Sequence, residues 1–136
     1  MARGAAPADA TAGGGRRVVA AETPWDVAPV RAWLESRVAA SKLDQAAADR
    51  QGYEARDDYD KAAAEEWACR ALLADDSAGE QVAFAARIKT LLGQDDYRQA
   101  GVNDDERFER HVRAALRKVA KMTKANEGWA NTRRYQ

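Results

Sequence analysis

The sequence predicts an all-α protein, a bundle of about four main helices with a disordered N-terminal arm and a short basic C-terminal tail. Alanine, the strongest helix former, accounts for 32 of the 136 residues. Apolar residues recur at helical spacing, while β-branched clusters and period-two alternation are absent from the chain. Leu, Ile, Val and Phe together number only 19, so we expect a thin core in which helices approach closely through alanine.

The expected organisation is an Ala/Gly-rich flexible arm over residues 1–22, a helical domain over residues 23–128 and a basic aromatic tail over residues 129–136. The arm has no apolar periodicity that a core could bury. Its Gly13–Arg17 run lacks the Gly-Lys-Ser/Thr ending of a phosphate-binding loop. We therefore expect a solvated arm, unless a partner orders it.

The first helix is expected to start at Asp26, whose carboxylate can accept hydrogen bonds from the free amides of the first turn. Pro29 falls inside that turn, where no amide is needed. The apolar stripe of this helix consists of Val30, Trp33, Leu34 and Val38. The helix is expected to run about 25 residues to Gln51-Gly52, and its second half to bury little except Leu43 and alanines.

A second helix is expected over about Tyr53 to Ala74. Its apolar side comprises Tyr59, Ala63, Trp67 and Ala71, flanked by Leu72 and Leu73. Gly52 separates it from the first helix in this interpretation. Because Gly costs only about 1 kcal/mol relative to Ala inside a helix, a single long rod through Gly52 stays open as an alternative.

Ser77 and Glu80 have the spacing of a capping box and predict the start of a third helix that ends at Gly93. Its expected apolar residues are Val82, Ala85, Ile88, Leu91 and Leu92, with Phe84 beside them. The segment from Gly93 to Asn103 is too short for more than a connecting turn.

Asn103 is expected to cap the last helix, with Glu106 in capping-box register. This helix is expected to end near Asn126 to Gly128. Its predicted core stripe is Phe108, Val112, Ala115, Leu116, Val119 and Met122.

Charge is distributed unevenly although the net charge is zero. Residues 1–20 sum to +2, residues 21–109 to −9 and residues 110–136 to +7. The positive residues of the last helix recur on the side opposite its apolar stripe, and they are Arg110, Arg113, Arg117, Lys121 and Lys124. In the tail, Arg133 and Arg134 lie between Trp129 and Tyr135, a mixture of cations and rings that single-stranded nucleic acid exploits.

Three interpretations of this basic end stay open. The cations can complement the negative end of the helix dipole and sit in water. They can contact phosphates of RNA or DNA, with Trp129 or Tyr135 stacking on bases. They can also dock the acidic region of a neighbouring copy.

Groups capable of catalysis are few. The chain has one histidine, His111, and one cysteine, Cys69, which form a nucleophile pair only if the fold joins the second and fourth helices there. Asp57 and Asp60 with Glu106 and Glu109 give a loose version of a magnesium site, so a helical nucleotide hydrolase is a remote alternative. We expect no catalytic residue, no metal and no cofactor.

The sequence thus predicts a non-enzymatic accessory subunit of a larger assembly that contacts nucleic acid or an acidic partner. The alternative is an adaptor or structural subunit of a phage or cellular particle without nucleic-acid contact. Other protein subunits or self-association are the expected partners, and RNA or DNA is the further candidate. No stretch has the 18 apolar residues of a membrane span and none resembles a secretory signal, so we expect a cytoplasmic protein. The Ala, Arg and Asp excess is compatible with a bacterial or phage origin.

Overall fold

The computed structural model describes residues 24–129, and within them it contains helices and no strand, which confirms the all-α class. The elements in order are α1 (Val27–Gln51), the 3-10 turn η2 (Tyr53–Ala55), α2 (Arg56–Leu73), the 3-10 turn η3 (Asp76–Gly79), α3 (Gln81–Leu92) and α4 (Asp105–Ala125). The arm predicted over residues 1–22 and three tail residues assigned to binding, Arg133, Arg134 and Tyr135, lie outside this range.

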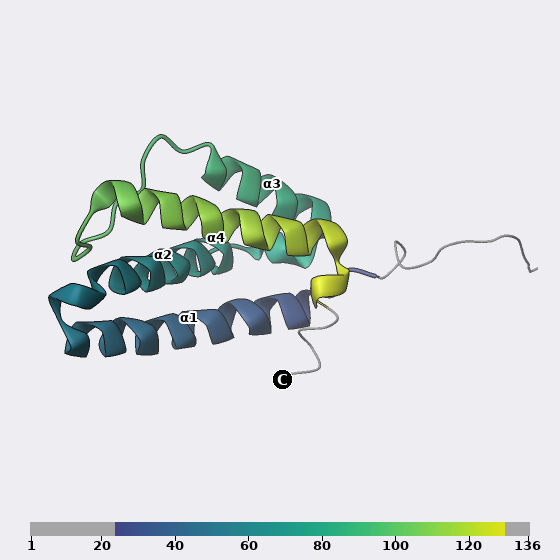
Figure 1. Ribbon diagram of the computed structural model, residues 1–136. Coiled ribbons are helices and arrows are strands. Elements are labelled where there is room, and N and C mark those ends of the chain that lie inside the picture. Colours follow the sequence, from purple (N-terminus) through teal and green to yellow (C-terminus); the bar gives the residue numbers. More distant parts are fainter. Residues whose placement is uncertain (1–23, 130–136) are drawn as a thin grey trace, which may run out of the picture.

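The four α-helices pack in a simple order (Figure 1). α1 lies against α2, α2 against α4, and α4 against the shorter α3. α2 therefore lies between α1 and α4, which places many of its alanines in the interior, namely Ala62, Ala63, Ala64 and Ala68. No helix within residues 24–129 combines the length and apolar character needed to cross a membrane.

The two ends of α1 are where the sequence predicts them. The side chain of Asp26 accepts a hydrogen bond from the backbone N–H of Ala28 at 3.0 Å. The helix ends at Gly52, which has a φ of 87° that L-residues rarely adopt. The break between the first two helices is thus confirmed, and the continuous rod is not formed.

The second half of α1 does not bury Leu43, contrary to expectation. The Leu43 side chain is 72% exposed, whereas Ser41 and Ala48 are buried. Leu34, Ser41 and Ala48 are spaced seven residues apart and so share one face, which turns Leu43 toward the opposite side.

The start of α3 corrects a second prediction. Ser77 and Glu80 do not form a capping box, because Asp75 accepts a hydrogen bond from the backbone N–H of Ser77 and the short turn η3 intervenes before Gln81. Val82 is 82% exposed and Ala85 is exposed. The residues that α3 buries are Phe84, Ile88 and Leu91. Burying the Phe84 ring directs Val82, two residues earlier, away from the core because two helical positions differ by about 200°.

At α4 the capping residue is Asp104, not Asn103. The Asp104 carboxylate accepts a hydrogen bond from the backbone N–H of Arg107 at 3.0 Å. Asn103 is used elsewhere, because its backbone and side chain both donate to Asp60. The helix ends at Asn126, in the left-handed conformation with a φ of 58°, within the predicted range.

Trp129 lies in the core, although the sequence suggested a tail position. Its side chain is 2% exposed, and its ring centroid lies 5.4 Å from that of Trp33 and 6.4 Å from those of Trp25 and Phe84. The left-handed Asn126 reverses the chain after α4, and the backbone N–H of Trp129 donates to the Asn126 carbonyl at 3.1 Å. The core thus includes Trp129, the residue that follows the predicted boundary at 128.

Candidate nucleic-acid interface

α4 is amphipathic in the way that its sequence predicts. Its buried residues include Phe108, Val112, Leu116 and Val119. Of the predicted stripe, Ala115 and Met122 are only partly buried at its margin. The opposite side of the helix faces away from the core and carries exposed cations.

We use the term cationic face for the exposed side chains of Arg110, Arg117, Lys121 and Lys124. Within residues 24–129 none of these four forms an ion pair with an acidic side chain. From Arg110 to Ala125 the helix has six basic residues and no acidic one. At a rise of about 1.5 Å per residue, the face extends about 21 Å along the helix axis.

Arg113 lies on the same side of α4 but is engaged within the protein. Its guanidinium donates to the carbonyl of Gln94 at 3.3 Å and to Glu109 at 3.4 Å, and it lies 5.0 Å from the centre of the Tyr97 ring. This residue therefore fastens the α3–α4 connection onto α4. Of the five helix residues predicted to bind a partner, four have free charges and Arg113 does not.

The beginning of α4 has the opposite charge. Asp104, Asp105 and Glu106 precede or open the helix, where carboxylates are favoured by the positive end of the dipole. The hydrogen bond from the backbone N–H of Arg107 holds the pKa of the Asp104 carboxyl below its usual value. α4 is consequently polarised along its length, acidic at the start and basic over its last four turns.

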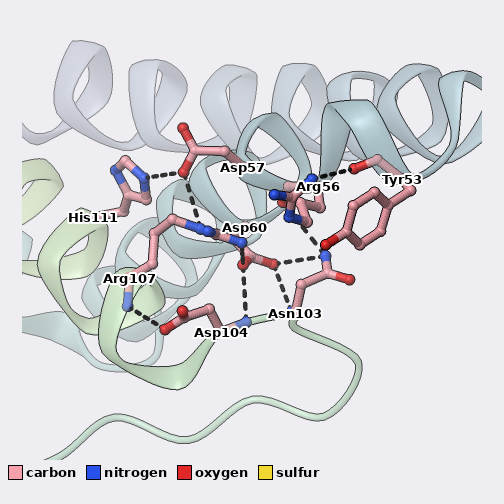
Figure 2. Close-up of polar contacts among 8 residues, drawn as sticks. All are labelled: Tyr53, Arg56, Asp57, Asp60, Asn103, Asp104, Arg107 and His111. Atoms are coloured by element: carbon pink, nitrogen blue, oxygen red, sulfur yellow. Dashed lines mark hydrogen bonds and ion pairs between the residues drawn. The ribbon is translucent and has the colours of Figure 1, made fainter.

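A second polar cluster joins α2 to α4 around the buried carboxylate of Asp60 (Figure 2). Asp60 accepts hydrogen bonds from the backbone and side chain of Asn103, from the backbone N–H of Asp104, and from Arg107 at 3.0 Å. Arg107 also forms an ion pair with Asp57 at 3.0 Å, and the Nε2 atom of His111 lies 3.2 Å from the same Asp57 oxygen.

These contacts overturn the suggested magnesium site. Asp57 and Asp60 are engaged by Arg107, while Glu109 pairs with Arg113 instead of joining them. Glu106 is exposed at the start of α4. Within residues 24–129 no group of three or more His, Cys, Asp or Glu side chains is arranged to hold a metal ion.

Cys69 and His111 do not form the pair that a cysteine nucleophile requires. Cys69 is 1% exposed, and burial together with the nearby Glu65 charge raises the pKa of its thiol to about 12. A thiol with this pKa stays protonated at neutral pH and is a poor nucleophile. His111 instead faces Asp57 at the edge of the cluster around Asp60.

An open groove of about 660 Å³ lies between α1, α2 and α4. Alanines from all three helices line it, with charged side chains of both signs among them. Two of those charges are paired, since Arg37 and Glu65 form an ion pair at 2.8 Å. Positive and negative residues are equally numerous in its lining, so the groove presents no concentrated charge.

No protein-family model, curated protein or solved structure matches this chain. Functional inference therefore rests on the geometry of the chain itself. Its most distinctive feature is the cationic face, which the sequence predicts through the helical spacing of its residues. The cluster around Asp60 was not predicted as a structural unit, because no local pattern links a residue of α2 to the turn before α4.

Proposed function

We propose that this protein is a non-catalytic accessory subunit, a helical bundle that binds nucleic acid through the cationic face of α4. A single observation carries the proposal: four exposed Arg and Lys side chains lie on one side of α4 along about 21 Å, without an acidic partner in the described chain. Such rows of free cations contact the phosphate backbone, whose bound counterions are released on binding.

The internal contacts explain why the face stays available. Three acidic residues near α4 are used elsewhere, since Asp57 and Asp60 pair with Arg107 and Glu109 pairs with Arg113. Arg113 thereby neutralises Glu109, which directly precedes Arg110 in the sequence. Beyond Arg110 the helix contains no carboxylate that could fold over the cations.

A solvated helix end and an acidic protein neighbour are the competing explanations. Cations at a helix C-terminus are favourable in water because they complement the dipole, which accounts for Lys124 in the last turn. Because the dipole effect is confined to that turn, it does not account for Arg110, Arg117 and Lys121, which precede it.

The proposal is tested by titrating the full chain into fluorescent single-stranded RNA, single-stranded DNA and duplex DNA at low and high salt. The test variant changes Arg110, Arg117, Lys121 and Lys124 to Ser. A matched control changes four exposed cations of other elements, Lys42, Arg50, Lys61 and Arg98, to Ser.

We expect salt-sensitive binding by the natural chain and by the control, and its loss in the α4 variant. Equal loss in both variants would mean that net charge alone is responsible and would contradict the proposal. Absence of binding by the natural chain at low salt would also contradict it, and would favour an acidic protein or a second copy as the partner of this face.

A further inference from the structure

Resting on the proposed function of α4, we infer that the nucleic acid is a duplex, held by its phosphates without recognition of base sequence. Proteins that bind single strands supply aromatic rings on which unpaired bases stack. Within residues 24–129, the rings nearest α4 are buried or, like the partly buried Trp33 beneath Lys118, packed against other side chains. Both the location of the rings and the composition of the face carry this inference.

The rings near α4 are occupied with one another. Trp129, which the sequence suggested as a stacking ring, is 2% exposed and packs edge-on against Trp33 at 5.4 Å. Tyr97 is also 2% exposed and lies under the Arg113 guanidinium. The exposed ring within residues 24–129 is that of Tyr53, in η2, and its face is covered by Arg56 at 3.9 Å. None of these rings presents a free face to a base at the α4 surface.

The face also lacks the neutral polar side chains that read base edges. α4 contains no Asn, Gln or Ser, and its one Thr, Thr123, is 2% exposed and donates to the Val119 carbonyl at 2.8 Å. The nearby amide of Gln81 is likewise used, because it donates to the Thr123 carbonyl at 2.7 Å. Exposed alanines, Ala114 and Ala125, occupy positions among the cations. Apart from the guanidinium groups of Arg110 and Arg117, the described face therefore offers charge to phosphates and little to bases.

A straight row of cations matches a stiff rod better than a flexible strand. Over about 21 Å of axis a duplex presents about 12 phosphates, and one strand at the same rise presents about half as many. Duplex DNA is straight on this scale, since its persistence length is about 50 nm. A single strand loses conformational freedom when it is extended along a rigid helix, and nothing on the described face compensates that loss by stacking.

The test measures fluorescence anisotropy of the full chain with two duplexes of about 20 base pairs that differ in sequence and with one of their strands alone. For the duplexes, four phosphate contacts predict a slope of log K against log salt of about −3.6. Affinity should accordingly fall about 150-fold between 50 and 200 mM salt. We expect the two duplexes to bind within twofold of each other and the single strand to bind at least fivefold more weakly.

Binding of the single strand as tightly as the duplex, still lost in the α4 variant, would overturn the duplex inference and leave the proposed function standing. More than tenfold discrimination between the two duplexes would overturn sequence-independent contact. Loss of all binding to every probe, or full binding by the α4 variant, would instead overturn the proposed function. A variant with Arg133, Arg134 and Tyr135 changed to Ala completes the set: retained duplex binding supports the inference, and its loss contradicts the role given to α4.

Discussion

The Oδ1 atom of Asp60 accepts a hydrogen bond from the backbone N–H of Asn103 at 2.8 Å, joining two residues 43 positions apart. Asp60 is fully buried on α2, and Asn103 lies in the turn that leads into α4. The same carboxylate accepts from Asp104 and Arg107, so it sets the position at which α4 begins. The orientation of the cationic face thus depends on a residue outside α4.

Asp60→Ala is expected to destabilise the protein by about 3–5 kcal/mol, because Arg107 and two backbone N–H groups lose a buried charged partner. The free energy of unfolding in urea measures the effect. Asp58→Ala is the matched control on the same helix, since Asp58 is exposed, and its change should stay within about 0.5 kcal/mol. A cost for Asp60→Ala as small as that of the control would show that the buried cluster contributes nothing.

Trp129→Ala is expected to cost about 3–5 kcal/mol, because it removes a buried ring that contacts Trp25, Trp33 and Phe84. Thermal unfolding followed by circular dichroism measures the change. Leu43→Ala serves as the control, because a side chain that is 72% exposed leaves no cavity when it is shortened. If the Trp129 variant kept the natural stability but bound nucleic acid more weakly, the prediction would be contradicted and Trp129 would be assigned to the binding interface.

Acid is expected to weaken the contact between α1 and α2. Burial raises the pKa of Glu65, but hydrogen bonds from Arg37 and Ser41 outweigh it, so the pKa lies below its ordinary value of 4.5. Because the pKa of Glu65 is lowered in the folded state, its ionised carboxylate stabilises the protein at pH values above 4.5. This stabilisation is lost as the pH falls through the lower pKa of the folded state.

Glu65→Gln should therefore reduce the loss of stability between about pH 5 and pH 3, at a cost of about 1 kcal/mol near neutrality. Urea midpoints measured across this range test the prediction. Ser41→Ala removes one of the three hydrogen bonds that Glu65 accepts and should give a smaller effect of the same sign. An acid dependence unchanged in Glu65→Gln would contradict the assignment.

Cys69 is expected to react with a thiol reagent only when the protein unfolds. Its raised pKa of about 12 leaves almost no thiolate at pH 8, and its 1% exposure blocks the reagent. The rate of reaction with a thiol reagent that releases a coloured product is measured with and without urea. A Leu43→Cys, Cys69→Ala double variant provides an exposed thiol on the same chain and should react at once without urea. Rapid reaction of the natural chain under native conditions would contradict burial of Cys69.

Local signals in the sequence predicted much of this fold. The Asp26 cap, the break at Gly52 and the apolar stripe of α4 each depend on residues within a few positions of one another. The wrong prediction at the start of α4 involves tertiary competition. Asn103 was expected to cap α4, but a buried carboxylate 43 residues away holds it, and the neighbouring Asp104 caps the helix instead.

The sequence predicted only part of the candidate site, because contacts between elements also shape it. Helical spacing alone brings Arg110, Arg117, Lys121 and Lys124 to one side of α4. Spacing does not show that the chain turns back after Asn126 and buries Trp129, nor that a ring from the preceding connection lies beneath Arg113. Both depend on contacts between elements, which a single sequence does not display.

Arg113 and Arg117 provide the sharpest comparison, because both lie on the outer side of α4 but differ in their internal contacts. Arg117→Gln should reduce the salt slope of duplex binding by about 0.9, since it removes one phosphate contact, and leave stability within about 0.5 kcal/mol. Arg113→Gln should leave the slope unchanged and cost about 1 kcal/mol of stability, because Arg113 contacts Glu109, Gln94 and the Tyr97 ring. Salt titrations and urea unfolding of the two variants separate these effects. The opposite pattern would mean that Arg113 leaves its internal partners to bind, and that the free charge of Arg117 has no role.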